Sequence, residues 1–446
     1  MKRVILTVLL VVMLFAVGVK AADAPVMDLG GRTIRIQMQW ADITPIGPRG
    51  QYNWYEPDER LQAHIESVEK MFNCKIEFVY QGHSRDALEQ LRLSVLAGDQ
   101  PFDFFAHSIT PQLIADGLIQ PLNDIIGPDF YDGYPWIFRR PDPRMGASVG
   151  DTIYTFEYNN HSGEARYVLW NKSLLEREGV ESLYEFYDRG EWNWDTFEEV
   201  AHALTRDVDG DGIIDRWGIR SVNLMHEIIV MLVSNSARVS KTTADGRIEF
   251  DLLNPHVVET LDFMQRLYAD GVWAARGVAE LGEAAMSIQV GTDISGKGYQ
   301  DHFNTIGDEW GLILPPQGPN GQNEFNMFVD ARGAIPVYVE DPAAVIEVVS
   351  ALWQLKEPYI EDMETWEETY WERHVSGLFD MESYYFLTQP DVKPVFYPSQ
   401  IERGILFSSS GIEMFRRIIV DGESVTALLS AEQPVFQAQL DEILKQ

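Results

Sequence analysis

Cysteine is almost absent from this sequence of 446 residues, and basic residues are scarce. The one cysteine, Cys74, leaves no partner for an internal disulfide, a CxxC redox pair or a zinc site built from cysteines. Lysine and arginine together number 35 against 69 acidic residues, which gives a formal net charge of −34. Contact with phosphate needs a basic surface, so this balance argues against nucleic acid or an anionic membrane surface as a partner.

Long apolar runs are also missing, with one exception at the N-terminus. Lys2 and Arg3 precede an apolar run, Val4–Gly18, which is too short for a membrane span of about 20 residues. Small residues flank Lys20 in the segment Val19–Ala21, so residues 1–21 are predicted to be a signal peptide that is cleaved after Ala21. No cysteine follows the cut, which excludes a lipoprotein anchor, and we expect a periplasmic or extracellular protein. An uncleaved N-terminal anchor is the alternative.

The first mature segment alternates strand and helix signals. Ile34, Ile36 and Met38 recur on one side of a period-2 pattern, which predicts a strand. The pattern continues as a helix at 57–72, a strand at 75–80, a helix at 87–97 and a strand at 102–107. Strands and helices that alternate at this spacing indicate βαβ units and a mostly parallel sheet.

Beyond a stretch rich in Pro, Gly and Asp at 121–150, strand and helix signals resume. Asn193 and Asn254 each precede an amphipathic run, so their side chains are predicted to cap helices. The segment 341–356 opens with Asp-Pro and continues at helical spacing, and the last fifteen residues also read as a helix. Further strands are predicted at 152–158 and 165–170. The fold class is therefore predicted to be α/β throughout, with more than one sheet.

Five segments, in order, resemble family 1 extracellular solute-binding proteins, the maltodextrin-binding-like receptors of bacterial ABC importers. They include the runs LRLSVLAGDQPFDFF, VLWNKSLLEREGV and GEAAMSIQVGTDI, and they cover residues 91–126, 168–180, 192–219, 282–294 and 310–353. The resemblance implies a periplasmic-binding-protein-like fold, with two doubly wound α/β lobes joined by hinge crossings. The N-terminal lobe would comprise 22–124 plus 330–388, and the C-terminal lobe 125–329 plus 389–446.

A carbohydrate presents an apolar C–H face and a rim of hydroxyls, which suits an aromatic side chain together with carboxylate, amide or guanidinium groups. Because doubly wound sheets bind ligands at strand ends, four residues at predicted strand ends are candidate ligand contacts: Trp40, His107, Glu157 and Tyr158. The resemblance adds Asp293, Asp330 and Arg332.

These candidate contacts have alternatives. A tryptophan more often packs in a core than against a ligand, and Asp330 with Arg332 could form a structural ion pair. The family often has an aromatic residue near 291–293, where this sequence has Gly-Thr-Asp, so the identity of the sugar is left open.

An acidic loop carries oxygen ligands at positions 1, 3, 5 and 9 of an EF-hand-like pattern. These are Asp207, Asp209, Asp211 and Asp215. Gly218 occupies the twelfth position, where an EF-hand has a bidentate glutamate. The loop is a candidate structural calcium site far from the cleft, and the alternative is an ordinary acidic turn. No cofactor is expected to be required.

The resemblance implies a receptor that is not an enzyme. It would bind a carbohydrate, expected to be an oligosaccharide, in the cleft between the lobes and deliver it to the transmembrane subunits of an ABC permease. We expect a monomer that does not bind nucleic acid. One alternative is a secreted glycoside-active enzyme with paired carboxylates at ~5–5.5 Å or ~6.5–9.5 Å. Another is the same scaffold binding a peptide, a polyol or a phosphodiester.

The signal-peptide prediction has a direct test. Mass spectrometry of the exported protein is expected to find a chain that starts near Ala22, because the small residues Val19 and Ala21 direct cleavage there. An exported chain that retains Met1 would contradict this prediction.

Overall fold

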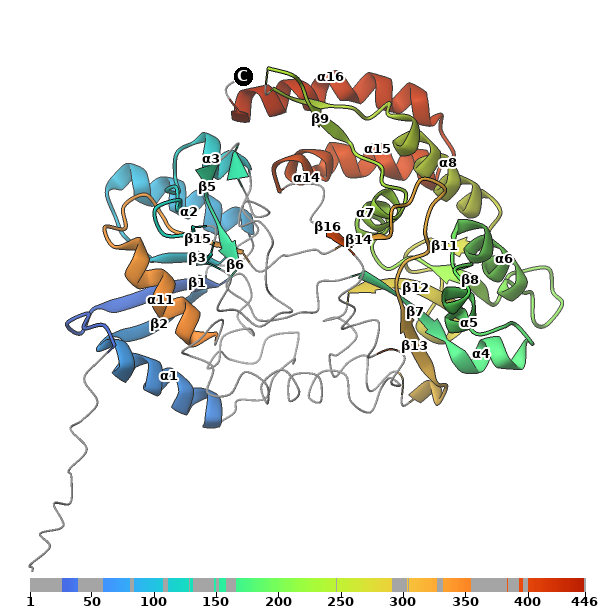
Figure 1. Ribbon diagram of the computed structural model, residues 1–446, viewed down its shortest axis with the longest axis horizontal. Coiled ribbons are helices and arrows are strands. Elements are labelled where there is room, and N and C mark those ends of the chain that lie inside the picture. The colour runs from blue at the N-terminus through green and yellow to red at the C-terminus, as the bar shows by residue number, and fades with distance from the viewer. Residues whose placement is uncertain are drawn as a thin grey trace, which may run out of the picture.

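The protein is described by a computed structural model in which two α/β halves lie on opposite sides of the molecule (Figure 1). The structure describes residues 26–38, 59–80, 84–106, 111–127, 129–130, 148–149, 152–157, 166–245, 247–290, 303, 305–326, 332–353, 383, 393–395 and 400–444. Within these ranges, no helix is both long enough and apolar enough to cross a membrane.

The first sheet has five strands in the order β2-β1-β3-β15-β6. The strand β1 is parallel to its neighbours β2 and β3. This arrangement confirms the predicted βαβ pattern. The strand β15 enters between β3 and β6 and is antiparallel to both. The bounds are β1 (Thr33–Met38), β2 (Lys75–Tyr80), β3 (Phe104–Ala106), β15 (Arg332–Ala334) and β6 (Phe156–Glu157).

Helices cover this sheet, and all but the short α3 were predicted from the sequence. They are α1 (Glu59–Phe72), α2 (Ser84–Ala97), α3 (Pro111–Ala115) and α11 (Pro342–Leu352). Ile34, Ile36 and Met38 are fully buried, as their alternation predicts, and they share a core with apolar residues of α1 and α11. Gly98 ends α2 with φ of 74°, a backbone conformation that favours glycine.

The second sheet also has five strands, in the order β11-β8-β12-β7-β13. The strands β11, β8 and β12 are parallel, and β7 runs antiparallel to both β12 and β13. All six residues of β7 are buried, as expected for a strand covered on both faces. The bounds are β7 (Arg166–Asn171), β8 (Trp217–Arg220), β11 (Trp273–Ala274), β12 (Ala284–Val290) and β13 (Trp310–Ile313).

Helices also pack around this second sheet. In the whole described chain, three predicted helix starts are capped as the sequence indicates, two in this half and that of α11 in the first half. The oxygens of Asn193, Asn254 and Asp341 accept hydrogen bonds from the amides of Thr196, His256 and Ala344. The helices are α4 (Lys172–Arg177), α5 (Leu183–Asp188), α6 (Trp194–Leu204), α7 (Leu224–Ser234), α8 (Pro255–Ala269), the 3₁₀ helix η4 (Leu281–Glu283), α14 (Gln400–Leu406), α15 (Ser409–Ile419) and α16 (Val425–Leu444).

Three short strand pairs complete the topology. They are β4 (Ser148–Val149) with β5 (Thr152–Ile153), β9 (Ser240–Thr242) with β10 (Ile248–Phe250), and β14 (Glu324–Asn326) with β16 (Lys393–Val395). The predicted strand at 152–158 is therefore two short strands, β5 and β6, with a break between them.

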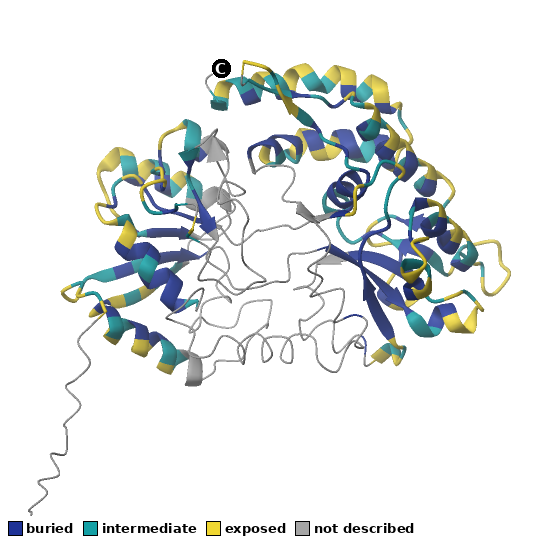
Figure 2. Cartoon of the chain, in the orientation of Figure 1, coloured by how far each residue is buried: buried dark blue, intermediate teal, exposed yellow. Residues whose placement is uncertain are grey.

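Each sheet has its own hydrophobic core, and Figure 2 shows these as buried regions on the two sides of the molecule. The chain builds β1, β2, β3 and β6, completes the second sheet, and then returns to the first sheet as β15. The helices α14 and α16 contact α3, where Ile114 packs against the cores of both halves. The predicted domain boundaries stay a prediction. The range 125–329 was assigned to the C-terminal lobe, but β6, which falls in this range, belongs to the first sheet.

One close packing contact leads to a stability prediction. A Cβ atom on Gly218 of β8 would lie 2.2 Å from the carbonyl oxygen of Ala201 on α6. Gly218→Ala is therefore expected to lower the free energy of unfolding by about 1–3 kcal/mol, because backbone must move to relieve the clash. Chemical denaturation measures this difference. Gly127→Ala, which has open space around the new Cβ, is the matched control. Equal stability of the two variants would contradict the prediction.

Candidate functional site

The candidate site begins at one edge of the first sheet, where several strand ends meet. Because β1 and β3 are parallel, their carboxyl ends, Met38 and Ala106, lie next to each other in the register. The strand β15 is antiparallel to β3 and pairs Gly333 with Ala106, so its first residue, Arg332, lies at the same edge. In β6 the register partner of Arg332 is Glu157. In Figure 1 this edge faces the middle of the molecule.

Two of the seven predicted ligand contacts are thus brought together by strand register, namely Glu157 and Arg332. The other five lie outside the described residues: Trp40, His107, Tyr158, Asp293 and Asp330. Three of these five residues closely follow the end of a described strand. Trp40 follows β1, which ends at Met38, His107 follows β3, which ends at Ala106, and Asp293 follows β12, which ends at Val290. All seven contacts stay predictions.

The second sheet has a corresponding edge. The parallel strands β8 and β12 end there, and the antiparallel strand β7 begins there, with Arg166 paired to Val290. The helix α7 follows β8 directly, so its N-terminal turn lies beside this edge. A helix N-terminus carries unpaired amide donors and a partial positive charge, and ligands of doubly wound sheets bind beside such turns.

A buried carboxyl group occupies this N-terminal turn. Glu227 is fully buried and accepts hydrogen bonds from the Ser221 hydroxyl, at 2.8 and 3.0 Å, and from the amides of Val222 and Asn223. Burial raises the pKa of Glu227 to about 7, against the opposing effect of these donors. Burial, and next the charge of Glu227, also raise the pKa of the nearby Tyr268 hydroxyl.

Two arginines act electrostatically on the residue next to Glu227. His226 is largely buried, and burial followed by the charges of Arg166 and Arg403 lowers its pKa to about 2. His226 is therefore neutral at physiological pH, whereas the two arginines are charged. The guanidinium group of Arg166 is almost fully buried at the start of β7. In an acidic protein, two arginines therefore act on this one turn beside the second sheet.

Arg166, His226 and Glu227 were not among the residues predicted from the sequence. A signal for the last two was present, because they are the charged or titratable positions in the otherwise apolar helix LMHEIIVMLVS. A charged residue inside a fully apolar run is rarely buried unless it is paired or functional. The position of Arg166 carried no comparable signal, since its burial depends on segments distant in sequence.

A separate pocket of about 790 Å³ lies on the second half, between the N-terminal turns of α6 and α8. Its aromatic residues, Trp194 and Phe263, stack on each other at 4.3 Å between ring centroids and are themselves buried. Neither Glu157 nor Arg332 lines this pocket. The pocket therefore does not belong to the edge where those two residues meet.

The acidic loop lies between α6 and β8. Carboxylate oxygens of Asp207, Asp209 and Asp215 lie within 4.8 Å of one another. Asp211 is not part of this group, and its carboxylate accepts a hydrogen bond from the amide of Ile213 at 2.8 Å. Amides within the loop also donate to Asp207 and Asp215.

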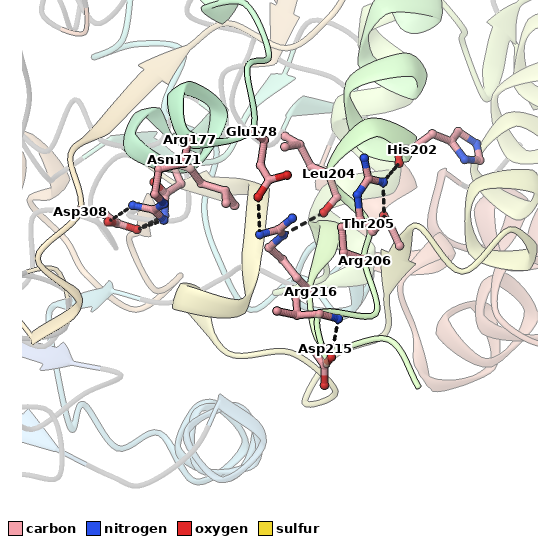
Figure 3. A network of polar contacts seen from close by, with 12 residues as sticks. Asn171, Arg177, Glu178, His202, Leu204, Thr205, Arg206, Asp215, Arg216 and Asp308 are labelled. Atoms are coloured by element: carbon pink, nitrogen blue, oxygen red, sulfur yellow. Dashed lines mark hydrogen bonds and ion pairs between the residues drawn. The ribbon is translucent and has the colours of Figure 1, made fainter. Parts of the chain in front are cut away.

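The base of the loop is fixed by Arg216, which pairs with Glu178 at 2.9 Å and donates to the Leu204 carbonyl (Figure 3). The twelfth position of the calcium pattern, Gly218, lies inside β8 against Ala201, so a glutamate has no room there. The calcium hypothesis stays a prediction.

The buried carboxyl group gives a pH prediction. The folded-state pKa of Glu227 lies above its ordinary value of 4.5, so its contribution to stability is fully present below pH 4.5 and is lost as pH rises through about 7. Relative to Glu227→Gln, the wild-type protein should lose about 3 kcal/mol of stability over that range. Urea denaturation at several pH values measures this difference. Glu176→Gln, an exposed acid on α4, should show no such trend. A constant difference for Glu227→Gln would contradict the prediction.

Comparison with known proteins identifies the architecture. Residues 56–352 match the family described as bacterial extracellular solute-binding protein. No curated protein sequence matches the chain. Among solved structures, the maltose/maltodextrin-binding domain MalE of Bdellovibrio bacteriovorus bound to maltotriose is similar, with a TM-score of 0.55 and 16% identity over 92% of this chain and 99% of that one.

Two further structures are similar at comparable levels. The sugar-binding protein MalE of Xanthomonas citri has a TM-score of 0.59 and 16% identity over 93% of this chain and 97% of that one. UgpB of Mycobacterium tuberculosis in complex with glycerophosphocholine has a TM-score of 0.59 and 15% identity over 92% and 99%. The predicted fold class, two α/β lobes of the periplasmic-binding-protein type, is confirmed. The family match over most of the sequence shows that the chain belongs to the bacterial extracellular solute-binding proteins.

Proposed function

We propose that the protein is the receptor of an ABC importer and that it binds a carbohydrate between the two sheet edges without altering it. The observation that carries the proposal is the register pairing of Glu157 with Arg332 at the edge where the first-sheet strands end. A glutamate and an arginine that are register neighbours at such an edge are residue types suited to the hydroxyl rim of a sugar. Similar folds are seen with maltotriose bound.

In this proposal, residues of both halves of the protein recognise the sugar. Trp40 and Tyr158 offer aromatic faces to the sugar ring, and His107, Asp293 and Asp330 offer polar groups to its hydroxyls. The ligand contacts both edges only when the halves are closed together, so binding favours the closed state. A buried polar site also rejects ligands that leave its groups unpaired.

The proposal extends to the biological setting, and the family supports its extracellular part. The protein is exported with its signal peptide removed, acts as a monomer in the periplasm or outside the cell, and delivers its ligand to the transmembrane subunits of a permease. The acidic surface steers this encounter electrostatically, an effect that salt would weaken.

A polyol phosphodiester is a second candidate ligand. The charges of Arg166 and Arg403 both act on His226, and two arginines are compatible with a phosphate group. One similar structure holds glycerophosphocholine. This candidate uses the same scaffold and the same closure, and differs only in the class of ligand.

A ligand screen tests the proposal. Neutral mono- and oligosaccharides and glycerophosphodiesters are added to the purified protein, the melting temperature is recorded, and the ligand is analysed afterwards. We expect a stoichiometric stabilisation by an oligosaccharide that is recovered intact. Stabilisation by the phosphodiester alone would favour the second candidate, and cleaved saccharide would support the glycoside-active enzyme instead.

A variant then tests the site. Glu157→Gln should weaken the affinity for the identified ligand at least tenfold, or about 1.4 kcal/mol, because a charge-assisted hydrogen bond is lost. Isothermal titration calorimetry measures the change. Glu249→Gln on β10, an acid outside the first sheet, is the matched control and should bind as the wild type does. Unchanged affinity in Glu157→Gln would remove Glu157 from the site.

A further inference from the structure

Three side chains with metal-binding atoms meet on the surface of the second half, away from both sheet edges. Glu198 and His202 lie four residues apart on α6, a spacing that places them on the same face of the helix. Asp270 is the C-cap residue of α8 and reaches the same point from a second element. One ligand atom from each residue lies within 4.8 Å of the others.

The distances suit a small tetrahedral ion. Metal–ligand bonds of about 2.1 Å in a tetrahedral zinc site place neighbouring ligand atoms about 3.4 Å apart. The Nε2 atom of His202 lies 3.5 Å from an oxygen of Asp270 and 4.0 Å from an oxygen of Glu198. Zinc binding needs the distance from His202 to Glu198 to shorten by about 0.6 Å. The Glu198 and Asp270 oxygens lie within 4.8 Å of each other and also move together when an ion binds.

A neighbouring arginine holds one of the ligands in place. Arg266 donates from Nη2 to the Oε2 atom of Glu198 at 2.6 Å, and from Nε to Oε1 at 3.1 Å. Oε1 is also the atom nearest to His202. Metal-binding carboxylates are commonly oriented by a second hydrogen bond of this kind. Arg266 leaves the cluster with a net charge of −1 when His202 is neutral, which favours a cation.

The helix dipole at this location favours a cation, and solvent access allows an ion to enter. Asp270 caps the C-terminus of α8, where the helix dipole has its negative end. The side chains are reachable from solvent, with exposed fractions of 23% for Glu198, 46% for His202 and 41% for Asp270. Figure 3 shows the imidazole of His202 directed away from Arg206 and Arg216.

We propose that Glu198, His202 and Asp270 form a zinc site that links α6 to the end of α8. One nitrogen and two oxygens supply three protein ligands, and water completes the tetrahedron. An imidazole ligand selects zinc over calcium or magnesium, which prefer oxygen donors throughout. The ion stabilises the second half by joining two helices that are distant in sequence, and it takes no part in ligand binding.

The test uses the mature protein freed of metal by a chelator, with zinc chloride as the probe. Zinc at 100-fold excess over its dissociation constant should raise the melting temperature by about 3 °C or more, because it binds the folded state alone. His202→Gln and Asp270→Asn should abolish this shift. His256→Gln, a histidine at the other end of α8, and Asp207→Asn, in the acidic loop, should retain it. Calcium and magnesium should give no shift that depends on His202.

X-ray absorption of the zinc-loaded protein gives a second readout that does not depend on stability. The expected zinc environment has one imidazole nitrogen and two carboxylate oxygens among light-atom ligands. The proposal is overturned if zinc gives no shift, if His202→Gln keeps the full shift, or if Asp207→Asn loses it, since the last result would place zinc in the acidic loop.

Discussion

The position of β15 is the constraint on which this architecture depends. The strand returns to the first sheet after the second sheet is complete, and it enters antiparallel between β3 and β6. Its Gly333 lies directly against the ring of Phe104, where a Cβ atom would clash at 1.8 Å. This entry makes Arg332 the register neighbour of Glu157, at the edge where β1 and β3 end. The edge therefore combines strands that precede and follow the second half in the sequence.

The two edges that face the middle of the molecule differ in chemistry. The first collects strand ends of the first sheet, with an acid and an arginine as register neighbours. The second combines the N-terminal turn of α7 with the buried carboxyl of Glu227 and the charges of Arg166 and Arg403. A ligand held between them meets polar groups from two separately packed cores. The closure that we propose for ligand binding would then need no change inside either core.

Local elements were predictable from the sequence because short-range physics determines them. The alternation of Ile34, Ile36 and Met38 gave the buried face of β1, and Asn193 and Asn254 gave two helix starts. Non-local features were not predictable in the same way. The pairing of β6 with β15, the burial of Arg166 and the fit of Gly218 against Ala201 each depend on contacts between distant segments. The last of these also explains why the acidic loop lacks a glutamate at its twelfth position.

Small-angle X-ray scattering of the purified protein, with and without a saturating oligosaccharide, tests whether the two halves close on an intact sugar. We expect the radius of gyration to fall when the sugar is added and to return to its starting value when the sugar is dialysed away. The sugar should be recovered intact. An unchanged radius of gyration with a bound sugar, or a sugar recovered in fragments, would contradict the proposal.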